Sequence, residues 1–359
     1  RAEDTGIRQG ALQLHEPKRA GIRLPSENPH FVKSALARLS PNDIVEFMDR
    51  KGVAWVEEEY GKLFCRRSSR DLLSAMVEEC KKAGAIILTG TKVDSVERVG
   101  RDPSRFFYSV TTNRGFFEAP SVVVATGGLS RQELGASDLG YRIAREFGIR
   151  ISPPRPALVP LLWNAGCRRR FGSLSGISLD ARVRIARGSF GGGVLFTHRG
   201  LSGPAILDAS LFRRPGEKIV VEILPEGEAR PFLRKMRTER PRAELKTVLA
   251  ARIPRRFAEA WCEASAPSRP MRSLKDRELN IIAGKLSRWE IAPAGSEGFA
   301  SAEVTSGGVD TKEISSKTME AKGAPGLFFA GEVLDVAGRI GGYNLHWAWA
   351  SGNAAGLVI

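Results

Sequence analysis

The chain has 359 residues, enough to bury a sizeable core, and two or three domains are expected at this length. Its 42% hydrophobic and 26% charged residues are ordinary for a globular protein and exclude a chain that is disordered throughout. No apolar run approaches the roughly 18 residues that a membrane span needs, so we expect no span. Four scattered cysteines without a C-x-x-C pair favour reduced thiols in a cytoplasmic protein, and their spacing predicts no metal site.

The formal net charge of +15 raises the question of nucleic-acid binding. The arginines are spread along the chain, and aromatic residues do not alternate with them as a platform for stacked bases. No recognisable nucleic-acid motif accompanies them. The sequence therefore favours solvated basic faces, which also attract an anionic cofactor or substrate, over a nucleic-acid partner.

Helix and strand signals alternate over the first 150 residues. Ser40-Pro41-Asn42-Asp43 predicts a helix start, because Ser caps the helix, Pro suits its first turn and an acid lies near its N-terminus. That helix extends to Lys51. Ser68 or Ser69 caps a second helix, whose apolar face is predicted to hold Leu72, Leu73, Met76, Val77 and Cys80. Short strands are predicted at residues 53–56, 62–65, 85–88, 106–112, 115–119 and 121–125, which together with the helices indicate a three-layer α/β domain.

The pattern changes after residue 152. Pro153-Pro154-Arg155-Pro156 is a stiff segment that suits a domain boundary. Short apolar runs with glycines at residues 153–225 predict a small barrel or sandwich, which residues 299–324 rejoin. Residues 226–298 form a basic, helical insert, with helical spacing at 231–237, 245–252, 255–264 and 278–289. The first α/β region, 1–152, resumes at 325–359.

The last 35 residues carry the strongest functional signal. Leu327–Ala330 is predicted as a buried strand that ends in Gly331-Glu332, and Gly341-Gly342-Tyr343-Asn344 opens a helix. A helix N-terminus offers free N–H groups and a partial positive charge, and Glu332 would accept hydrogen bonds from ribityl hydroxyls. The alternative is a purely structural strand–loop–helix. The acid after the strand together with the glycine pair favours a cofactor site.

Two other segments carry candidate residues. The strand before Thr126-Gly127-Gly128 ends in glycines that let a ligand approach the backbone, although a plain turn is the alternative. Within Leu195–Pro204, His198 lies beside Arg199 in a turn, and a histidine there would exchange a proton near neutral pH. The alternative for His198 is that it only holds the loop in place.

Several motifs of this chain, in their order and spacing, closely resemble the YhiN-type (BaiN-like) bacterial flavoproteins. The resemblance covers residue 26 to the end. The motifs are Asn28–Arg38, Gly127-Gly128-Leu129-Ser130, Gly140–Ala144, Pro156-Ala157-Leu158-Val159-Pro160, Phe196–Pro204, Ala302–Thr305, Gly307–Thr311, Ala330–Glu332 and Gly341–Asn344.

The resemblance implies an α/β fold with a glutathione-reductase-like FAD domain, interrupted by a β-barrel-like domain and a small helical domain. It implies an FAD-dependent oxidoreductase that passes a hydride from NAD(P)H through the flavin to an organic acceptor such as an enone, a small-molecule substrate. The backbone of Val93 would approach the adenine, and His198 and Tyr343 are the candidates for a catalytic acid. The remaining cofactor contacts would come from Thr126, Gly127, Gly128, Gly331, Glu332, Gly341, Gly342, Tyr343 and Asn344.

One departure from these flavoproteins is large. They begin with a strand, G-x-G-x-x-G and a helix, which hold the FAD pyrophosphate, whereas residues 1–25 contain only the isolated Gly6, Gly10 and Gly21. We therefore expect an FAD domain that is incomplete at its N-terminus, a truncated form with weak FAD affinity and poor solubility. The alternatives are an inactive flavoprotein fragment and a non-redox flavin- or RNA-associated binding protein, the latter motivated by the basic helical insert.

Overall fold

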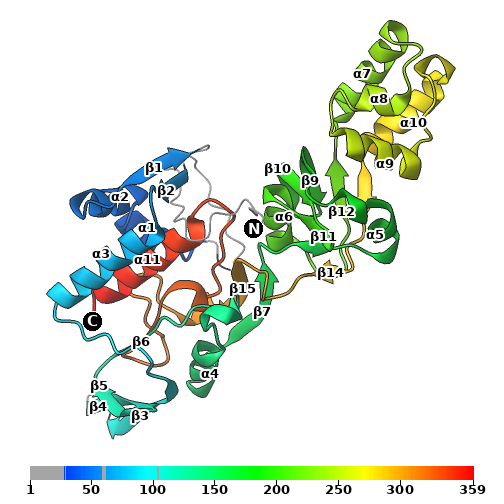
Figure 1. Cartoon of the computed structure of the whole chain (residues 1–359). Coiled ribbons are helices and arrows are strands. Elements are labelled where there is room, and N and C mark those ends of the chain that lie inside the picture. The colour runs from blue at the N-terminus through cyan, green and yellow to red at the C-terminus, as the bar shows by residue number, and fades with distance from the viewer. Residues whose placement is uncertain (1–27, 29, 59–61, 103–104) are drawn as a thin grey trace. The chain divides into compact units, whose positions relative to one another are not determined.

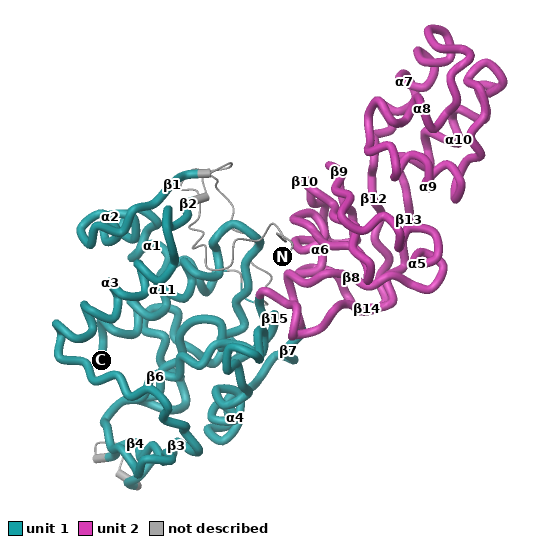
Figure 2. Tube along the Cα trace, in the orientation of Figure 1, with its two compact units in different colours: residues 1–155, 304–359 teal, residues 156–303 magenta. Residues whose placement is uncertain are grey.

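A computed structural model describes residues 28, 30–58, 62–102 and 105–359 and divides the chain into two compact units (Figure 1). Unit 1 comprises the chain up to Arg155 and again Val304–Ile359, and unit 2 comprises Pro156–Glu303 (Figure 2). Gly6, Gly10 and Gly21 lie outside the described residues. No helix in the described ranges combines the length and apolarity that crossing a membrane requires.

Unit 1 is built on small sheets. A parallel pair joins β6 (Val122–Val124) to β16 (Leu327–Phe329), with Val122 opposite Leu327. A second pair joins β7 (Ile151–Ala157) to β15 (Val304–Val309), whose six residues are all buried. The predicted hairpin at residues 106–119 is confirmed. It belongs to an antiparallel sheet of β3 (Val93–Asp102), β4 (Arg105–Thr112) and β5 (Gly115–Ala119), and a separate hairpin joins β1 (Trp55–Glu58) to β2 (Lys62–Cys65).

The helix predicted from Ser40 is confirmed as α2 (Pro41–Arg50). Ser40 Oγ accepts a hydrogen bond from the Asp43 N–H at 3.3 Å, and Asp43 Oδ2 accepts one from the Ser40 N–H at 2.6 Å. This reciprocal pair satisfies two donors that a helix start leaves unpaired. The other helices of unit 1 are α1 (Lys33–Arg38), α3 (Ser69–Lys82), α4 (Leu139–Glu146) and α11 (Tyr343–Gly356), with 3-10 turns at Gln132–Leu134, Thr311–Glu313 and Gly331–Val333.

Two expectations for unit 1 are wrong. Residues 85–88 form no strand, and Ile86 is 84% exposed. On α3 the buried residues are Leu72 and Ala75, whereas Leu73 is 59% exposed. Both errors concern apolar side chains that no other part of the described chain covers. Val123 on β6 is exposed as well.

Unit 2 contains an antiparallel seven-stranded sheet in the order β13-β12-β9-β10-β11-β8-β14. The pairing leaves β13 and β14 as edges, so the sheet is open and does not form a closed barrel, one of the two arrangements expected from the sequence. The short apolar runs expected to form strands within residues 153–225 do contain strands. The elements are β8 (Leu161–Leu162), β9 (Ser178–Ile185), β10 (Gly188–Phe196), β11 (Gly200–Ser202), β12 (Ile219–Glu222), β13 (Trp289–Ile291), β14 (Gly295–Ser296), α5 (Ala165–Phe171), a 3-10 turn at Gly172–Leu174, and α6 (Pro204–Phe212).

The helical insert leaves the sheet after β12 and returns at its neighbour β13. Phe257 of this insert packs against Phe196 and Trp289 of the sheet, with ring centroids 5.2 and 5.7 Å apart. Each of the four segments predicted as helical contains a helix. They are α7 (Glu226–Glu239), α8 (Leu245–Leu249), α9 (Arg255–Ser265) and α10 (Asp276–Ser287), with a 3-10 turn at Met271–Ser273.

Candidate functional site

The carboxyl ends of β6 and β16 meet at one edge of their sheet because the two strands are parallel and in register. β6 continues into Thr126-Gly127-Gly128, and β16 continues into Gly331-Glu332. A Cβ added to Gly128 would lie 2.6 Å from Glu332 Oε1, which shows how closely the turns approach. The structure therefore brings these two predicted segments together.

Thr305 of β15 joins the two turns. Its Oγ1 accepts hydrogen bonds from the N–H groups of Leu129 at 2.8 Å and Ser130 at 3.1 Å, and it lies 3.0 Å from Ser130 Oγ. The Thr305 N–H donates to Glu332 Oε1 at 2.7 Å. The role of Thr305 was not predicted, although Ala302–Thr305 was among the motifs of the resemblance. Within the Val304–Val309 strand, the adjacent polar residues Thr305 and Ser306 directly before Gly307-Gly308 were the only local signal, and they do not identify the contact partners.

The centre of this arrangement is buried: Thr305 is 0% and Tyr141 1% exposed. Burial raises the pKa of Glu332, and the hydrogen bonds from Thr305 act in the opposite direction. Burial also raises the pKa of the Tyr141 phenol on α4, and the nearby carboxylates of Glu332 and Asp335 add to that effect. Tyr141 OH and Thr126 Oγ1 are buried without a hydrogen-bond partner in the described chain. Such hydroxyls cost about 1–3 kcal/mol each, so the region needs additional polar partners.

The predicted start of the C-terminal helix is confirmed as α11. Gly341 and Gly342 have φ of 125° and 88°, in the region that favours glycine. Asn344 closes the preceding loop: its Oδ1 accepts the Gly338 N–H at 2.6 Å, and its Nδ2 donates to Gly338 O at 2.9 Å. The helix is fixed to the Gly331 turn by Trp347 Nε1, which donates to Gly331 O at 3.1 Å.

The other predicted residues belong to other elements of the structure. Val93 begins β3, in the three-stranded sheet, and shares no hydrogen bond with the Gly128 or Glu332 turns. His198 is exposed in the β10–β11 turn of unit 2, whereas Tyr343 begins α11 in unit 1. The structure thus does not place the two acid candidates within one unit.

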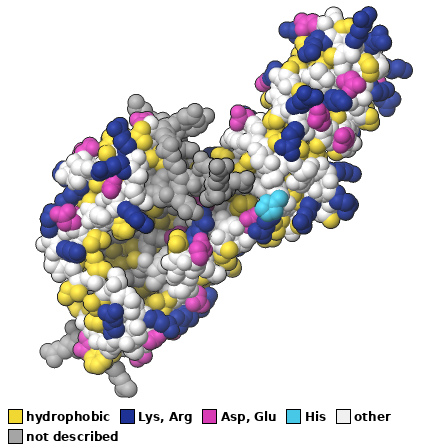
Figure 3. Space-filling model, in the orientation of Figure 1, with side chains coloured by type: hydrophobic (Ala, Val, Ile, Leu, Met, Phe, Trp, Pro, Cys, Tyr) yellow, Lys and Arg dark blue, Asp and Glu magenta, His cyan; other side chains and the backbone are white. Residues whose placement is uncertain are grey.

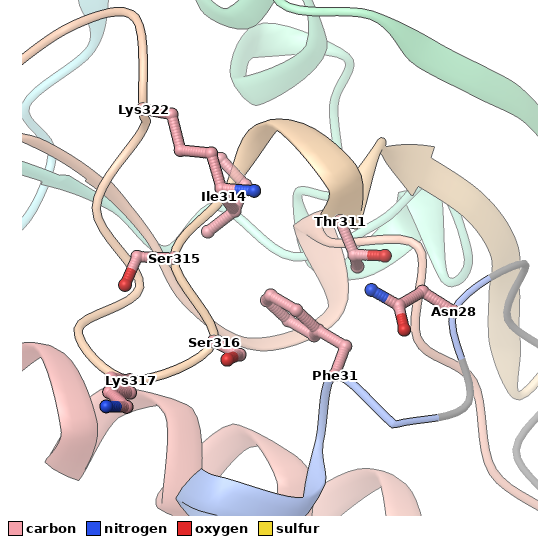
Figure 4. A pocket seen from close by; sticks show the side chains of 8 residues that line it. All are labelled: Asn28, Phe31, Thr311, Ile314, Ser315, Ser316, Lys317 and Lys322. Carbon is pink, nitrogen blue, oxygen red and sulfur yellow. The ribbon is translucent and has the colours of Figure 1, made fainter.

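A shallow cavity of about 410 Å³ in unit 1 lies elsewhere. Figure 4 shows the Phe31 ring at its centre, with Ile314 and Ser316 across from it and Asn28 beside Thr311. None of the predicted cofactor residues lines it. The cluster of Gly128, Thr305 and Glu332 is the candidate site.

The raised pKa of Glu332 predicts a pH-dependent stability. A carboxyl whose pKa is raised in the folded state favours folding while protonated, and this contribution is lost as the pH rises through that pKa. Glu332→Gln is uncharged and keeps an oxygen for the Thr305 N–H. The melting temperature of Glu332→Gln relative to the unmodified protein should therefore increase as the pH rises above the ordinary value of 4.5. Scanning fluorimetry of the flavin-free protein measures this difference.

The control for that measurement is Glu118→Gln, because Glu118 is exposed on β5 and its charge stays in water. Its difference in melting temperature should not change with pH. If the difference in melting temperature between Glu332→Gln and the unmodified protein were also independent of pH, burial would not destabilise the Glu332 carboxylate.

Comparison with known proteins places the chain in one family. The HI0933-like protein Rossmann domain matches residues 14–358. The chain is 40% identical over 337 residues to a protein of Haemophilus influenzae named ribosomal RNA dihydrouridine synthase, covering 93% of this chain and 83% of that protein. It is 39% identical over 328 residues to the Escherichia coli protein of the same name, covering 91% and 81% of the two chains.

A more distant relative carries a different name. The chain is 28% identical over 347 residues to the 3-dehydro-bile acid delta(4,6)-reductase of Clostridium scindens, covering 92% of this chain and 83% of that protein. Relatives of both kinds bear the names of enzymes, and the resemblance noted in the sequence is confirmed. The chain therefore belongs to the HI0933-like Rossmann-domain family.

Proposed function

We propose that the protein is an FAD-dependent reductase that uses NAD(P)H to saturate the C5=C6 bond of a uridine in ribosomal RNA. The two dihydrouridine synthases support the substrate, because each is about 40% identical over more than nine tenths of this chain. The proposed substrate differs from the expectation based on the sequence, which did not favour a nucleic-acid partner. The reaction class, hydride transfer from NAD(P)H through a flavin, is the one predicted.

The chemistry of uracil agrees with the acceptor expected from the sequence. Its C5=C6 bond is conjugated to the C4 carbonyl, so it is an enone in the electronic sense. Reduction of an enone adds a hydride to the carbon remote from the carbonyl and a proton to the adjacent carbon. A bound FAD would supply the hydride. The more distant relative, named as a reductase, supports reduction as the common reaction class.

The observation that carries the cofactor assignment is the junction of the two turns through Thr305. Gly127 has open space beside its Cα, where a ligand can approach the backbone, whereas Thr305 and Glu332 fill the space beside Gly128. Thr305 also fixes one oxygen of Glu332. The other carboxylate oxygen is the one we assign to ribityl hydroxyls. The N-terminus of α11 would stabilise negative charge on the cofactor.

The polar groups left unpaired also fit a flavin nucleotide. The buried Thr126 Oγ1 and Tyr141 OH lack partners in the described chain, and both are close to the Glu332 turn. A small movement of the Gly127-Gly128 turn would let ligand atoms or ordered water reach them. Because the pKa of Tyr141 is raised, its phenol stays protonated near neutral pH and acts as a donor.

Reduction of a small-molecule enone is the second candidate function, because the Clostridium scindens relative is named as a bile-acid reductase. The two functions differ in substrate and share the cofactor site. Only a substrate test separates them.

The test uses purified protein, FAD, NADH or NADPH, and ribosomal RNA from cells lacking the gene. Mass spectrometry of the digested RNA should show a nucleoside with two additional hydrogens, and Glu332→Gln should reduce its yield about tenfold or more. Bound flavin with reduction of a steroid enone and unchanged RNA would support the second candidate. A protein that binds no FAD would overturn both.

A further inference from the structure

The helical part of the insert, residues 226–288, carries much of the positive charge of the protein. It contains sixteen Lys and Arg residues against eight Asp and Glu residues. Figure 3 shows dark blue Lys and Arg side chains spread over this part of the surface. About half of the net charge of +15 therefore lies in 63 residues.

Internal ion pairs occupy nearly all of the acids of the insert and leave a subset of its cations unneutralised. Seven of the eight carboxylates pair with a cation of the same insert. Eight exposed cations of the insert have no carboxylate within ion-pair distance in the described chain. Two of them, Arg256 and Lys285, donate instead to the backbone carbonyls of Ser173 and Ser265, which leaves six. We name these six the basic end: Arg234, Arg240, Arg242, Arg272, Lys275 and Arg277.

The fold brings these six residues together from three segments. The loop after α7 pairs with the 3-10 turn before α10: the Met271 N–H donates to Ala243 O at 2.9 Å, and the Arg272 N–H donates to Pro241 O at 2.9 Å. Arg237 near the end of α7 donates to Leu274 O at 3.1 Å and pairs with Asp276 at 2.6 Å. Backbone hydrogen bonds and the contacts of Arg237 thus hold together the segments that carry these cations.

We propose that the basic end binds the phosphodiester backbone of the ribosomal RNA substrate, an inference that rests on the proposed function. Guanidinium groups form bidentate hydrogen bonds with phosphate, and five of the six cations are arginines. Neutralising phosphates releases counterions, which favours binding and makes it salt-dependent.

The surface chemistry favours RNA over an acidic protein. Stable protein interfaces are centred on buried apolar anchors. Among the exposed large hydrophobic residues of the described chain, only Ile281 lies in the insert. Aromatic side chains that would stack on bases are also absent from the basic end, so binding should depend little on base sequence.

The experiment compares two triple variants of the full-length protein. Arg240→Gln, Arg242→Gln and Arg272→Gln remove three cations of the basic end. The control carries Arg230→Gln, Lys246→Gln and Arg255→Gln, which remove three cations of the same insert that are paired with carboxylates. Binding of protein-free ribosomal RNA is measured against salt concentration, with melting temperature and bound flavin as checks of folding.

The basic-end variant should bind about tenfold to a hundredfold more weakly near 0.1 M salt, and its salt slope should fall by about 2–3 because each phosphate contact contributes ~0.7–0.9. The control should change affinity by less than about threefold. At saturating RNA, the basic-end variant should form dihydrouridine at the unmodified rate, with a raised KM. Equal losses in both variants would overturn the proposal, as would poly-glutamate binding as tightly as RNA.

The outcomes separate this proposal from the proposed function. If the unmodified protein binds RNA through the basic end and forms no dihydrouridine, the proposed reaction fails and the binding surface stands. If dihydrouridine forms and the basic-end variant keeps its affinity and KM, the reaction stands and the surface assignment fails.

Discussion

Replacing Gly128 with alanine should weaken FAD binding on the order of tenfold to a hundredfold. The added Cβ would lie 2.5 Å from Thr305 Oγ1 and 2.6 Å from Glu332 Oε1, closer than real Cβ atoms approach other heavy atoms. Thr305 and Glu332 must move apart, and the carboxylate then loses its fixed orientation. A charge-assisted hydrogen bond contributes about 1.5–3 kcal/mol, which corresponds to this loss of affinity. Titration of the flavin-free protein with FAD, followed by flavin fluorescence, measures it.

The matched control for Gly128→Ala is Gly352→Ala. Gly352 lies on the exposed face of α11, and a Cβ there meets no atom within 4 Å. This change should leave FAD binding unaltered and should stabilise the helix by about 0.5–1 kcal/mol, since alanine is the better helix former. If Gly128→Ala binds FAD as tightly as the unmodified protein, the cofactor does not bind at the Thr305 junction.

Features encoded by local sequence were predicted well. The start of α2 follows from Ser40 and Asp43, whose capping contacts need no residue outside one helical turn. β6 and β16 were predicted because short β-branched or aromatic runs end in glycine turns. The loop before α11 was predicted for the same reason: its glycines take positive φ.

Features that depend on distant partners were predicted poorly. Ala85–Leu88 has the composition of a buried strand, but a strand needs a neighbour, and the described chain provides none for it. Short apolar runs separated by glycines predicted strands in unit 2. They could not show whether the sheet closes, because closure depends on pairing between β13 and β14. Residues 299–324 were expected to rejoin the β-rich domain, whereas the structure groups Val304 onward with unit 1.

The junction residue Thr305 illustrates the same limit for the site. Glu332 and Gly128 were predicted because an acid or a glycine pair directly follows a strand. Thr305 acts through contacts to Leu129 and Ser130, which are more than 170 residues away in the chain. No local pattern predicts such a contact. The sequence therefore located the two turns and could not identify the side chain that joins them.

Replacing Thr305 with valine should reduce the free energy of unfolding by about 2–4 kcal/mol. Valine nearly matches threonine in shape but accepts no hydrogen bond, so the N–H groups of Leu129 and Ser130 and the Ser130 hydroxyl lose their shared acceptor. Thr305 is fully buried, at 0% exposure, and water cannot replace the lost oxygen. An unsatisfied buried donor costs about 1–3 kcal/mol. Urea denaturation of the flavin-free protein measures the change.

Thr305→Ser separates the hydrogen bonds from the packing of the methyl group. Serine keeps Oγ and removes one methyl group, so it should cost only about 1 kcal/mol. Because the Thr305 N–H is a backbone donor, its hydrogen bond to Glu332 Oε1 remains possible in both variants. A negligible loss in Thr305→Val beside a measurable loss in Thr305→Ser would assign the stability to packing of the methyl group. A larger loss in Thr305→Val, accompanied by weaker FAD binding, would show that the hydroxyl holds the Gly128 turn in the conformation that the cofactor needs.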